Sequence, residues 1–145
     1  MIAKPASGNS APLAGLRILV VEDDYYIADE ICTTLRNSGA EVLGPLPDVK
    51  NGLDVVTSEH IDCAVLDINL HGHLAFSLAR ELQQRGTPSI FATGYDSSVL
   101  PETFSSSVRL QKPIDLTALL QAVQSVCTRA HARKPDTEHQ GIGSA

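Results

Sequence analysis

Five short runs of apolar residues, each ending at a polar or turn-forming residue, constrain this chain more than any other feature. Between these runs, apolar residues recur at the spacing of a helix, as at Ile27, Ile31 and Leu35. Short apolar runs that alternate with helical patterns predict parallel strands joined by crossover helices. The expected strands are Leu16–Val21, Glu41–Leu46, Asp62–Leu66, Ser89–Ala92 and Val108–Leu110.

We therefore expect an α/β fold with a flavodoxin-like, doubly wound, five-stranded parallel sheet in the order 2-1-3-4-5. Three helices should begin at aspartate N-caps, which are Asp24, Asp48 and Asp115. The helix before Gly86 is expected to bury Leu74, Leu78 and Leu82. The segment from residue 95 to 107 is rich in serine and has little apolar periodicity. The fourth helix should therefore be shortened or irregular, with at most one or two turns near Val99–Phe104.

A chain of 145 residues fits one folded domain, which we expect to cover residues 15–128. The small, polar residues before it predict a disordered arm over residues 1–14. The loss of apolar periodicity after it predicts a flexible polar tail over residues 129–145. The three cysteines fall at apolar positions without metal-ligand spacing, so Cys32, Cys63 and Cys127 are expected to be reduced core thiols.

Charge and hydropathy exclude two classes of partner. The formal net charge of −6 gives no basic surface for nucleic acid, whose phosphates attract clusters of Lys and Arg. No apolar stretch approaches the roughly 20 residues that a membrane-spanning helix needs. The first residues also lack the apolar centre of a secretory signal, so a cytoplasmic protein is expected.

Charged and hydroxyl side chains follow the expected strands at the points where the strands end. They are Glu22, Asp23, Asp67, Thr93 and Lys112. The carboxyl ends of parallel strands meet at one edge of a sheet, so these side chains should share one site. Three neighbouring carboxylates repel one another, and hard oxygen ligands of this kind suit Mg²⁺. Asp67, at the tip of a strand, can act as a carboxylate nucleophile toward a phosphoryl group.

These residues resemble the signatures of response-regulator receiver domains. The matching pieces are Leu19–Asp23, Ala64–Asp67, Thr93–Gly94 and Lys112–Pro113, and the resemblance covers roughly residues 16–127. The stretch Phe91–Tyr95, which reads FATGY, also resembles a receiver subgroup named for that motif, known mostly as stand-alone receivers.

The resemblance implies a role for each site residue. Asp67 would be the phosphoacceptor, and Thr93 and Lys112 would bind the phosphoryl oxygens. Glu22, Asp23 and Asp67 would hold Mg²⁺ together with the backbone carbonyl of Asn69. The resemblance also implies a cis peptide bond between Lys112 and Pro113.

The chain departs from the general receiver pattern at several positions. Arg109 stands three residues before Lys112, where most receivers carry a switch aromatic, so Tyr95 is an alternative switch residue beside its interpretation as a plain loop aromatic. The separation of Thr93 and Lys112 is short. His71 replaces a frequent proline, and with His73 it forms a pair that we interpret as exposed loop histidines in preference to a metal site.

Three functional hypotheses follow. The leading one is a single-domain response regulator that accepts a phosphoryl group from a sensor histidine kinase onto Asp67 with Mg²⁺. It would act through a downstream protein partner, or as a phosphate sink, and would not be an enzyme; a homodimer stays open. The second is a receiver-fold scaffold that binds partners without phosphorylation. The third is a small aspartyl-phosphate phosphatase, which Asn69 disfavours because such enzymes commonly carry an acid–base Asp there.

Overall fold

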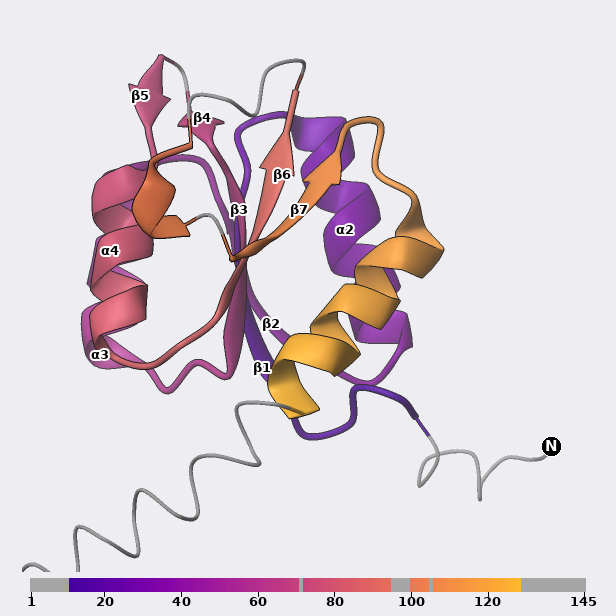
Figure 1. Ribbon diagram of the computed structural model, residues 1–145. Coiled ribbons are helices and arrows are strands. Elements are labelled where there is room, and N and C mark those ends of the chain that lie inside the picture. The colour runs from indigo at the N-terminus through magenta and orange to yellow at the C-terminus, as the bar shows by residue number, and fades with distance from the viewer. Residues whose placement is uncertain (1–10, 71, 95–99, 105, 129–145) are drawn as a thin grey trace, which may run out of the picture.

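A five-stranded parallel sheet forms the centre of the molecule (Figure 1). The computed structural model describes residues 11–70, 72–94, 100–104 and 106–128. The strands of this sheet are β1 (Arg17–Val21), β2 (Glu41–Leu46), β3 (Cys63–Asp67), β6 (Ser89–Thr93) and β7 (Val108–Gln111). Their spatial order is β2-β1-β3-β6-β7, which confirms the predicted order 2-1-3-4-5 when only these strands are counted.

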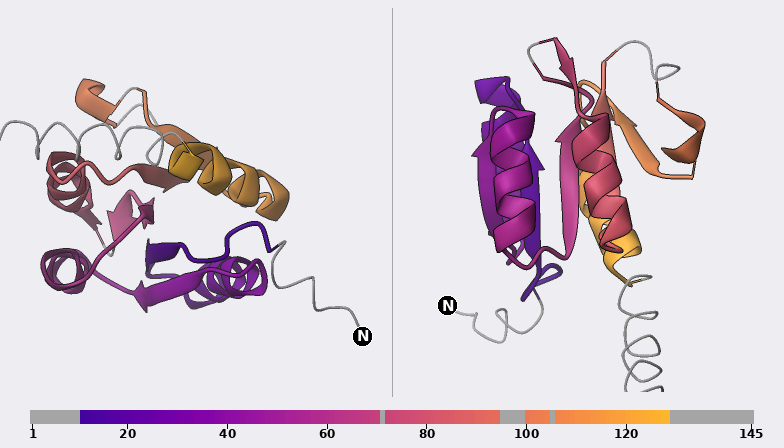
Figure 2. Two further views of the ribbon diagram at one scale, coloured as in Figure 1. Left: turned by 90° about the horizontal axis from the view of Figure 1, so that it is seen from below. Right: turned by 90° about the vertical axis from the view of Figure 1, so that its left-hand side faces the viewer.

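Helices cover both faces of the sheet (Figure 2). One face packs against α2 (Tyr25–Asn37) and against a C-terminal helix that the structure describes over residues 116–128. The other face packs against α3 (Val49–Ser58) and α4 (Phe76–Gln84). Side chains of a strand alternate between faces, so Ile18 and Val20 enter the first core while Leu19 and Val21 enter the second. Burial on both sides explains why β1 is a nearly continuous apolar run.

The three predicted N-caps are confirmed. Asp24 accepts hydrogen bonds from the backbone N–H groups of Tyr26 (2.9 Å) and Ile27 (3.1 Å) at the start of α2. Asp48 caps α3 in the same way, and Asp115 caps the C-terminal helix. These caps fix where each helix begins, and the first of them sets the position of α2 directly behind the acidic residues that follow β1.

The fourth helix is reduced to a short 3₁₀ turn, η2 (Glu102–Phe104), within the described part of the segment between β6 and β7. Phe104 is buried and anchors this turn. Its ring lies edge-on to Phe91 of β6, with centroids 5.5 Å apart, and is stacked on Phe76 of α4 at 6.3 Å. The expectation of a shortened fourth helix is confirmed for residues 100–104. Residues 95–99 and 105, and with them Tyr95, lie outside the described residues.

Two expectations about element boundaries are wrong. Leu74 is not on the helix with Leu78 and Leu82, because a two-stranded antiparallel hairpin of β4 (Asn69–Leu70) and β5 (His73–Leu74) precedes α4. The packed domain also begins before residue 15. Leu13 is fully buried, and its backbone N–H donates to the Ser38 carbonyl at 2.8 Å. Residues 1–10 and 129–145, with the rest of the predicted arm and tail, lie outside the described residues.

The edge strand β2 contains a proline within its predicted bounds, Glu41–Leu46. Pro45 lies inside β2, and the pairing with β1 skips from Leu19–Leu43 to Val21–Leu46. Gly44 has a φ of +124°, which suits glycine, and a Cβ there would lie 2.6 Å from the Val20 carbonyl oxygen. Proline lacks a backbone N–H, so a strand can contain it only where no neighbour needs that donor, as at the edge of a sheet.

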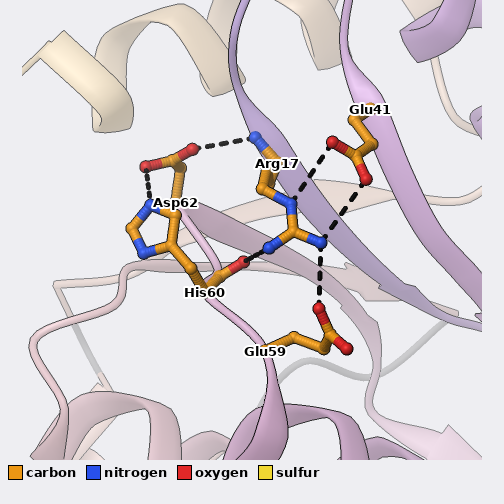
Figure 3. A network of polar contacts seen from close by, with 5 residues as sticks. All are labelled: Arg17, Glu41, Glu59, His60 and Asp62. Carbon is orange, nitrogen blue, oxygen red and sulfur yellow. Dashed lines mark hydrogen bonds and ion pairs between the residues drawn. The ribbon is translucent and has the colours of Figure 1, made fainter.

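The amino ends of the strands are joined by a polar network (Figure 3). The Arg17 guanidinium lies 3.3 Å from a carboxylate oxygen of Glu41 and 3.0 Å from one of Glu59, and it donates to the His60 carbonyl at 3.1 Å. The buried Asp62 carboxylate accepts the Arg17 backbone N–H at 2.8 Å and lies 3.0 Å from the His60 ring. The network therefore holds together the starts of β1, β2 and β3, at the end of the sheet opposite the acidic residues.

Candidate functional site

The predicted site residues lie at the carboxyl ends of four neighbouring strands. Glu22 and Asp23 follow β1, Asp67 ends β3, Thr93 ends β6 and Lys112 follows β7. Glu22 and Asp67 are buried, at 3% and 7% exposure, and Thr93 is buried as well. The Lys112 backbone N–H donates to the Thr93 carbonyl at 2.7 Å, which joins the ends of β6 and β7. The structure thus brings all of these residues to one edge of the sheet.

The three carboxylates form a compact cluster. Ligand oxygens of Glu22, Asp23 and Asp67 all lie within 4.8 Å of one another. At an effective dielectric constant of about 20, two unit charges 4 Å apart repel by roughly 4 kcal/mol. Lys112 offsets part of this repulsion, because its Nζ lies 2.9 Å from Glu22 Oε1 and 3.2 Å from Asp67 Oδ2. The ionised cluster still carries a net negative charge, since one ammonium faces three carboxylates.

The donor set fits a divalent cation. Glu22 Oε1 is buried and makes no hydrogen bond with the described residues. Its proximity to Lys112 Nζ is therefore an attraction of charges without hydrogen-bond alignment. A buried carboxylate oxygen of this kind is costly unless a cation coordinates it. With oxygens of Asp23 and Asp67 nearby, it forms the hard, incomplete ligand shell that Mg²⁺ prefers.

Backbone groups orient two of the carboxylates. The Asp24 N–H donates to Glu22 Oε2 at 3.0 Å, and the Asn69 N–H donates to Asp67 Oδ1 at 3.1 Å. The Asn69 side chain accepts the Gly72 N–H at 2.8 Å and so closes the β4–β5 turn. Sequence reasoning missed this turn, although an Asn three residues before a Gly is a turn signal that could have shown it. The Asn69 backbone N–H therefore lies beside Asp67, and the metal role of the Asn69 carbonyl stays a prediction.

Glu22 and Lys112 form an ion pair in the cluster, and their surroundings raise the pKa of both side chains. Burial raises the pKa of Glu22 to about 7; the Asp67 charge adds to this, while the Asp24 N–H and Lys112 oppose it. For Lys112, burial by itself would lower the pKa, but the contacts with Glu22 and Asp67 outweigh burial and the pKa is raised. Lys112 is therefore charged at neutral pH, whereas Glu22 is close to its titration midpoint in the metal-free protein.

The free energy of unfolding of the metal-free protein should depend on pH through Glu22. Its pKa rises from about 4.5 to about 7 on folding, so the native state holds more protons than the unfolded state within this window. The stabilising contribution of protonated Glu22 is therefore lost as the pH rises from about 4.5 to 7. Glu22→Gln should become progressively more stable relative to the wild type across the window, as measured by urea unfolding in EDTA. A difference between the two proteins that stays constant with pH would contradict this assignment.

The remaining sequence expectations have mixed outcomes. The cis peptide bond between Lys112 and Pro113 is confirmed. All three cysteines are buried thiols outside any disulfide, as expected. Arg109 lies exposed on β7, and His73 lies exposed on β5, while His71 falls outside the described residues. Within the described residues, no helix is both long and apolar enough to span a membrane.

Comparison with known proteins identifies the family. The model of the response regulator receiver domain matches residues 18–124. SdrG from Sphingomonas melonis Fr1 is a solved structure with 30% identity and a TM-score of 0.69, and the match covers 79% of this chain and 97% of that chain. A CheY-like receiver domain protein from Methanospirillum hungatei JF-1 has 27% identity and a TM-score of 0.71, with coverage of 81% and 97%.

Curated relatives agree with this family. The sensory transduction protein LytT from Bacillus subtilis (strain 168) is 26% identical over 113 residues, which cover 75% of this chain and 47% of LytT. This chain spans about half the length, or less, of the first curated relatives that it matches. Because the matched region of the family model includes β1 through most of the C-terminal helix, and the acidic cluster with it, the chain belongs to the family of response-regulator receiver domains.

Proposed function

We propose that this receiver accepts a phosphoryl group from a sensor histidine kinase onto Asp67 and signals as a single-domain response regulator. The observation that carries the proposal is the contact of Lys112 Nζ with both Glu22 and Asp67, inside a carboxylate cluster that suits Mg²⁺. The match with SdrG covers 97% of the solved chain, so that solved chain contains little beyond a receiver domain. The sequence of Phe91–Tyr95 supports membership of the FATGY subgroup.

The phosphoryl group would pass directly from the phosphohistidine of the kinase to Asp67. An Asp67 carboxylate oxygen forms a bond to phosphorus while the nitrogen–phosphorus bond of phosphohistidine breaks, and the imidazole nitrogen keeps that electron pair. Water later attacks phosphorus, the bond between phosphorus and the Asp67 oxygen breaks, and inorganic phosphate leaves as the carboxylate is restored. Bound Mg²⁺ supplies positive charge that neutralises the phosphoryl oxygens. The Asn69 N–H holds Asp67 Oδ1, which leaves Oδ2 beside Lys112.

Lys112 and Thr93 connect the site to the rest of the fold. The Lys112 ammonium would bind a phosphoryl oxygen in place of one carboxylate, and the Thr93 hydroxyl would bind another. The 2.7 Å backbone bond between these residues couples the ends of β6 and β7, so movement at one is transmitted to the other. Output would follow from a change of the surface between residues 94 and 110, through a downstream protein or a homodimer, or the protein would serve as a phosphate sink.

Mass spectrometry of the intact protein tests this function. With acetyl phosphate as a small phosphodonor and Mg²⁺ present, we expect the protein to gain the mass of one phosphoryl group. The added group should be lost on treatment with hydroxylamine, because an acyl phosphate is labile to this nucleophile. Replacing Mg²⁺ by EDTA should prevent the gain. Absence of labelling in saturating Mg²⁺ would contradict the proposal and favour a scaffold that is not phosphorylated.

A further inference from the structure

Two of the three buried cysteines lie against each other in the core. Cys63 begins β3, and Cys127 lies at the end of the described part of the C-terminal helix, at 0% and 3% exposure. Their thiols are hydrogen bonded to each other. In Figure 1 the start of β3 and the far end of this helix lie at the same end of the sheet, opposite the acidic cluster. The contact therefore joins two elements that are far apart in the sequence.

The periodicity of both elements explains why these thiols meet. Side chains of β3 alternate between the two faces of the sheet, and Cys63 lies with Val65 in the core that α2 and the C-terminal helix cover. On the helix, Cys127 continues a buried stripe of residues four apart, with Leu119 and Val123. Each thiol therefore faces the other element from a fixed position on its own backbone.

Cys32 of α2 is buried in the same core but has different neighbours. The charged groups that act on its thiol are Arg36 and Asp29, which lie on its own helix, and among the described residues no cysteine acts on it. All three cysteines are almost fully buried, so Cys32 differs from the other two in its neighbours and not in its exposure. It is thus an internal control for any chemistry that requires a second thiol.

We propose that Cys63 and Cys127 form a disulfide when hydrogen peroxide oxidises the protein, and that this bond fastens the C-terminal helix to β3. One thiolate attacks a peroxide oxygen and becomes a sulfenic acid. The O–O bond breaks, and the departing hydroxide takes up the proton that this thiol has lost. The second thiol then attacks the sulfenic sulfur, and the sulfenic oxygen leaves as water. The two thiols lose two electrons, and both peroxide oxygens end as water.

Burial makes this oxidation slow. Contact with Cys127 and burial together raise the pKa of the Cys63 thiol well above its usual value, so the reactive thiolate is scarce in the packed core. Peroxide can reach the pair only when the helix separates locally from β3. The same packing would shield the disulfide from reducing thiols once the helix has closed again. The bond therefore forms slowly and, once formed, is slow to be reduced.

The disulfide would restrain two elements that lead to the acidic site. β3 ends at Asp67, and the C-terminal helix begins at its Asp115 cap, three residues after Lys112. A bond at the opposite end of both elements leaves these site residues in place but prevents the helix from detaching. It also closes a long loop of the chain, which restricts the unfolded state and so stabilises the folded one.

Counting thiols by mass spectrometry tests the proposal. The reduced full chain is treated with hydrogen peroxide, quenched with catalase, unfolded and alkylated with iodoacetamide. We expect a monomer in which only Cys32 is alkylated, whereas the untreated protein is alkylated at all three cysteines. A non-reducing peptide map should join the peptides of Cys63 and Cys127. The oxidised protein should unfold at a higher urea concentration, and the amides of the C-terminal helix should exchange hydrogen more slowly.

Single substitutions separate the pair from the third thiol. Cys32→Ala should form the disulfide as the wild type does, and should then have no thiol left to alkylate. Cys127→Ala removes one partner, so Cys63 and Cys32 should both stay alkylatable and peroxide should not change the urea midpoint. If Cys127→Ala does not fold, Cys63→Ala serves the same purpose, and the peptide map of the wild type needs no variant.

Several results would contradict the proposal. Three alkylated cysteines after prolonged peroxide treatment would overturn it, as would a disulfide through Cys32 or between two chains. Sulfinic acid at Cys63 or Cys127 without a disulfide would mean that the two sulfur atoms cannot reach bonding distance, and would overturn it as well. An oxidised protein that unfolds at the same or a lower urea concentration would contradict the fastening of the helix.

Discussion

Asp67→Asn is expected to abolish labelling by acetyl phosphate in the presence of Mg²⁺. A carboxamide has nearly the same shape as a carboxylate but is neither ionised nor nucleophilic, so no acyl phosphate can form on it. The substitution also removes one of the three negative charges of the cation site and one of the two carboxylates beside Lys112. Intact-mass spectrometry should show the unmodified mass alone, and the affinity for Mg²⁺ measured by titration calorimetry should fall.

Asp62→Asn provides a matched control on the same strand. Asp62 immediately precedes β3 and Asp67 ends it, and both side chains are buried, at 8% and 7% exposure. Asp62 serves the polar network at the opposite end of the sheet, so its variant should still be labelled. Persistent labelling of Asp67→Asn would remove Asp67 from the phosphoacceptor role. Loss of labelling in both variants would indicate a general effect of altering β3.

Phe104→Ala is expected to lower the free energy of unfolding by about 3 kcal/mol or more, the range for removing a buried aromatic ring. Phe104 is 2% exposed and contacts Phe91 and Phe76. The turn η2 is only three residues long, and Phe104 is its buried residue, so this ring anchors the described turn to the core. Urea unfolding followed by circular dichroism would measure the change.

Thr103→Ala is the control for this prediction. Thr103 lies in the same turn but is exposed, and a surface change of this kind usually alters stability by less than about 0.5 kcal/mol. A similar loss in both variants would indicate that the backbone of the turn, and not the Phe104 ring, determines stability. A negligible loss in Phe104→Ala would mean that the cavity collapses without cost, and that the ring does not anchor the segment.

The sheet order and the composition of the site could be predicted because both follow from one rule. Parallel strands place their carboxyl ends together, so the residues after the apolar runs, such as Glu22, Asp67 and Lys112, had to meet at one edge. The aspartate caps were predictable for a similar reason, since Asp24 interacts with N–H groups only two or three residues away. In each case a local pattern determined the outcome.

The hairpin after Asp67 could not be predicted from periodicity. Leu74, Leu78 and Leu82 have the spacing of a helix, and nothing in that pattern marks where the helix begins. The boundary is set instead by the Ala75–Ile68 backbone bond and by the turn at Gly72, whose φ is +84°. The burial of Glu22 Oε1 without a hydrogen bond could not be predicted from the sequence either. It depends on how the strands place the Glu22 side chain against Lys112.

The proline in β2 determines how this sheet can grow. A strand from another molecule could extend the sheet only by hydrogen bonding along an outer margin, as in cross-β assembly. On the β2 margin, Pro45 has no N–H to donate and the pairing register is interrupted beside it, so an incoming strand cannot form a continuous ladder there. Strand addition to the five-stranded sheet is therefore easier at β7, where the exposed Arg109 and Gln111 side chains make the margin polar.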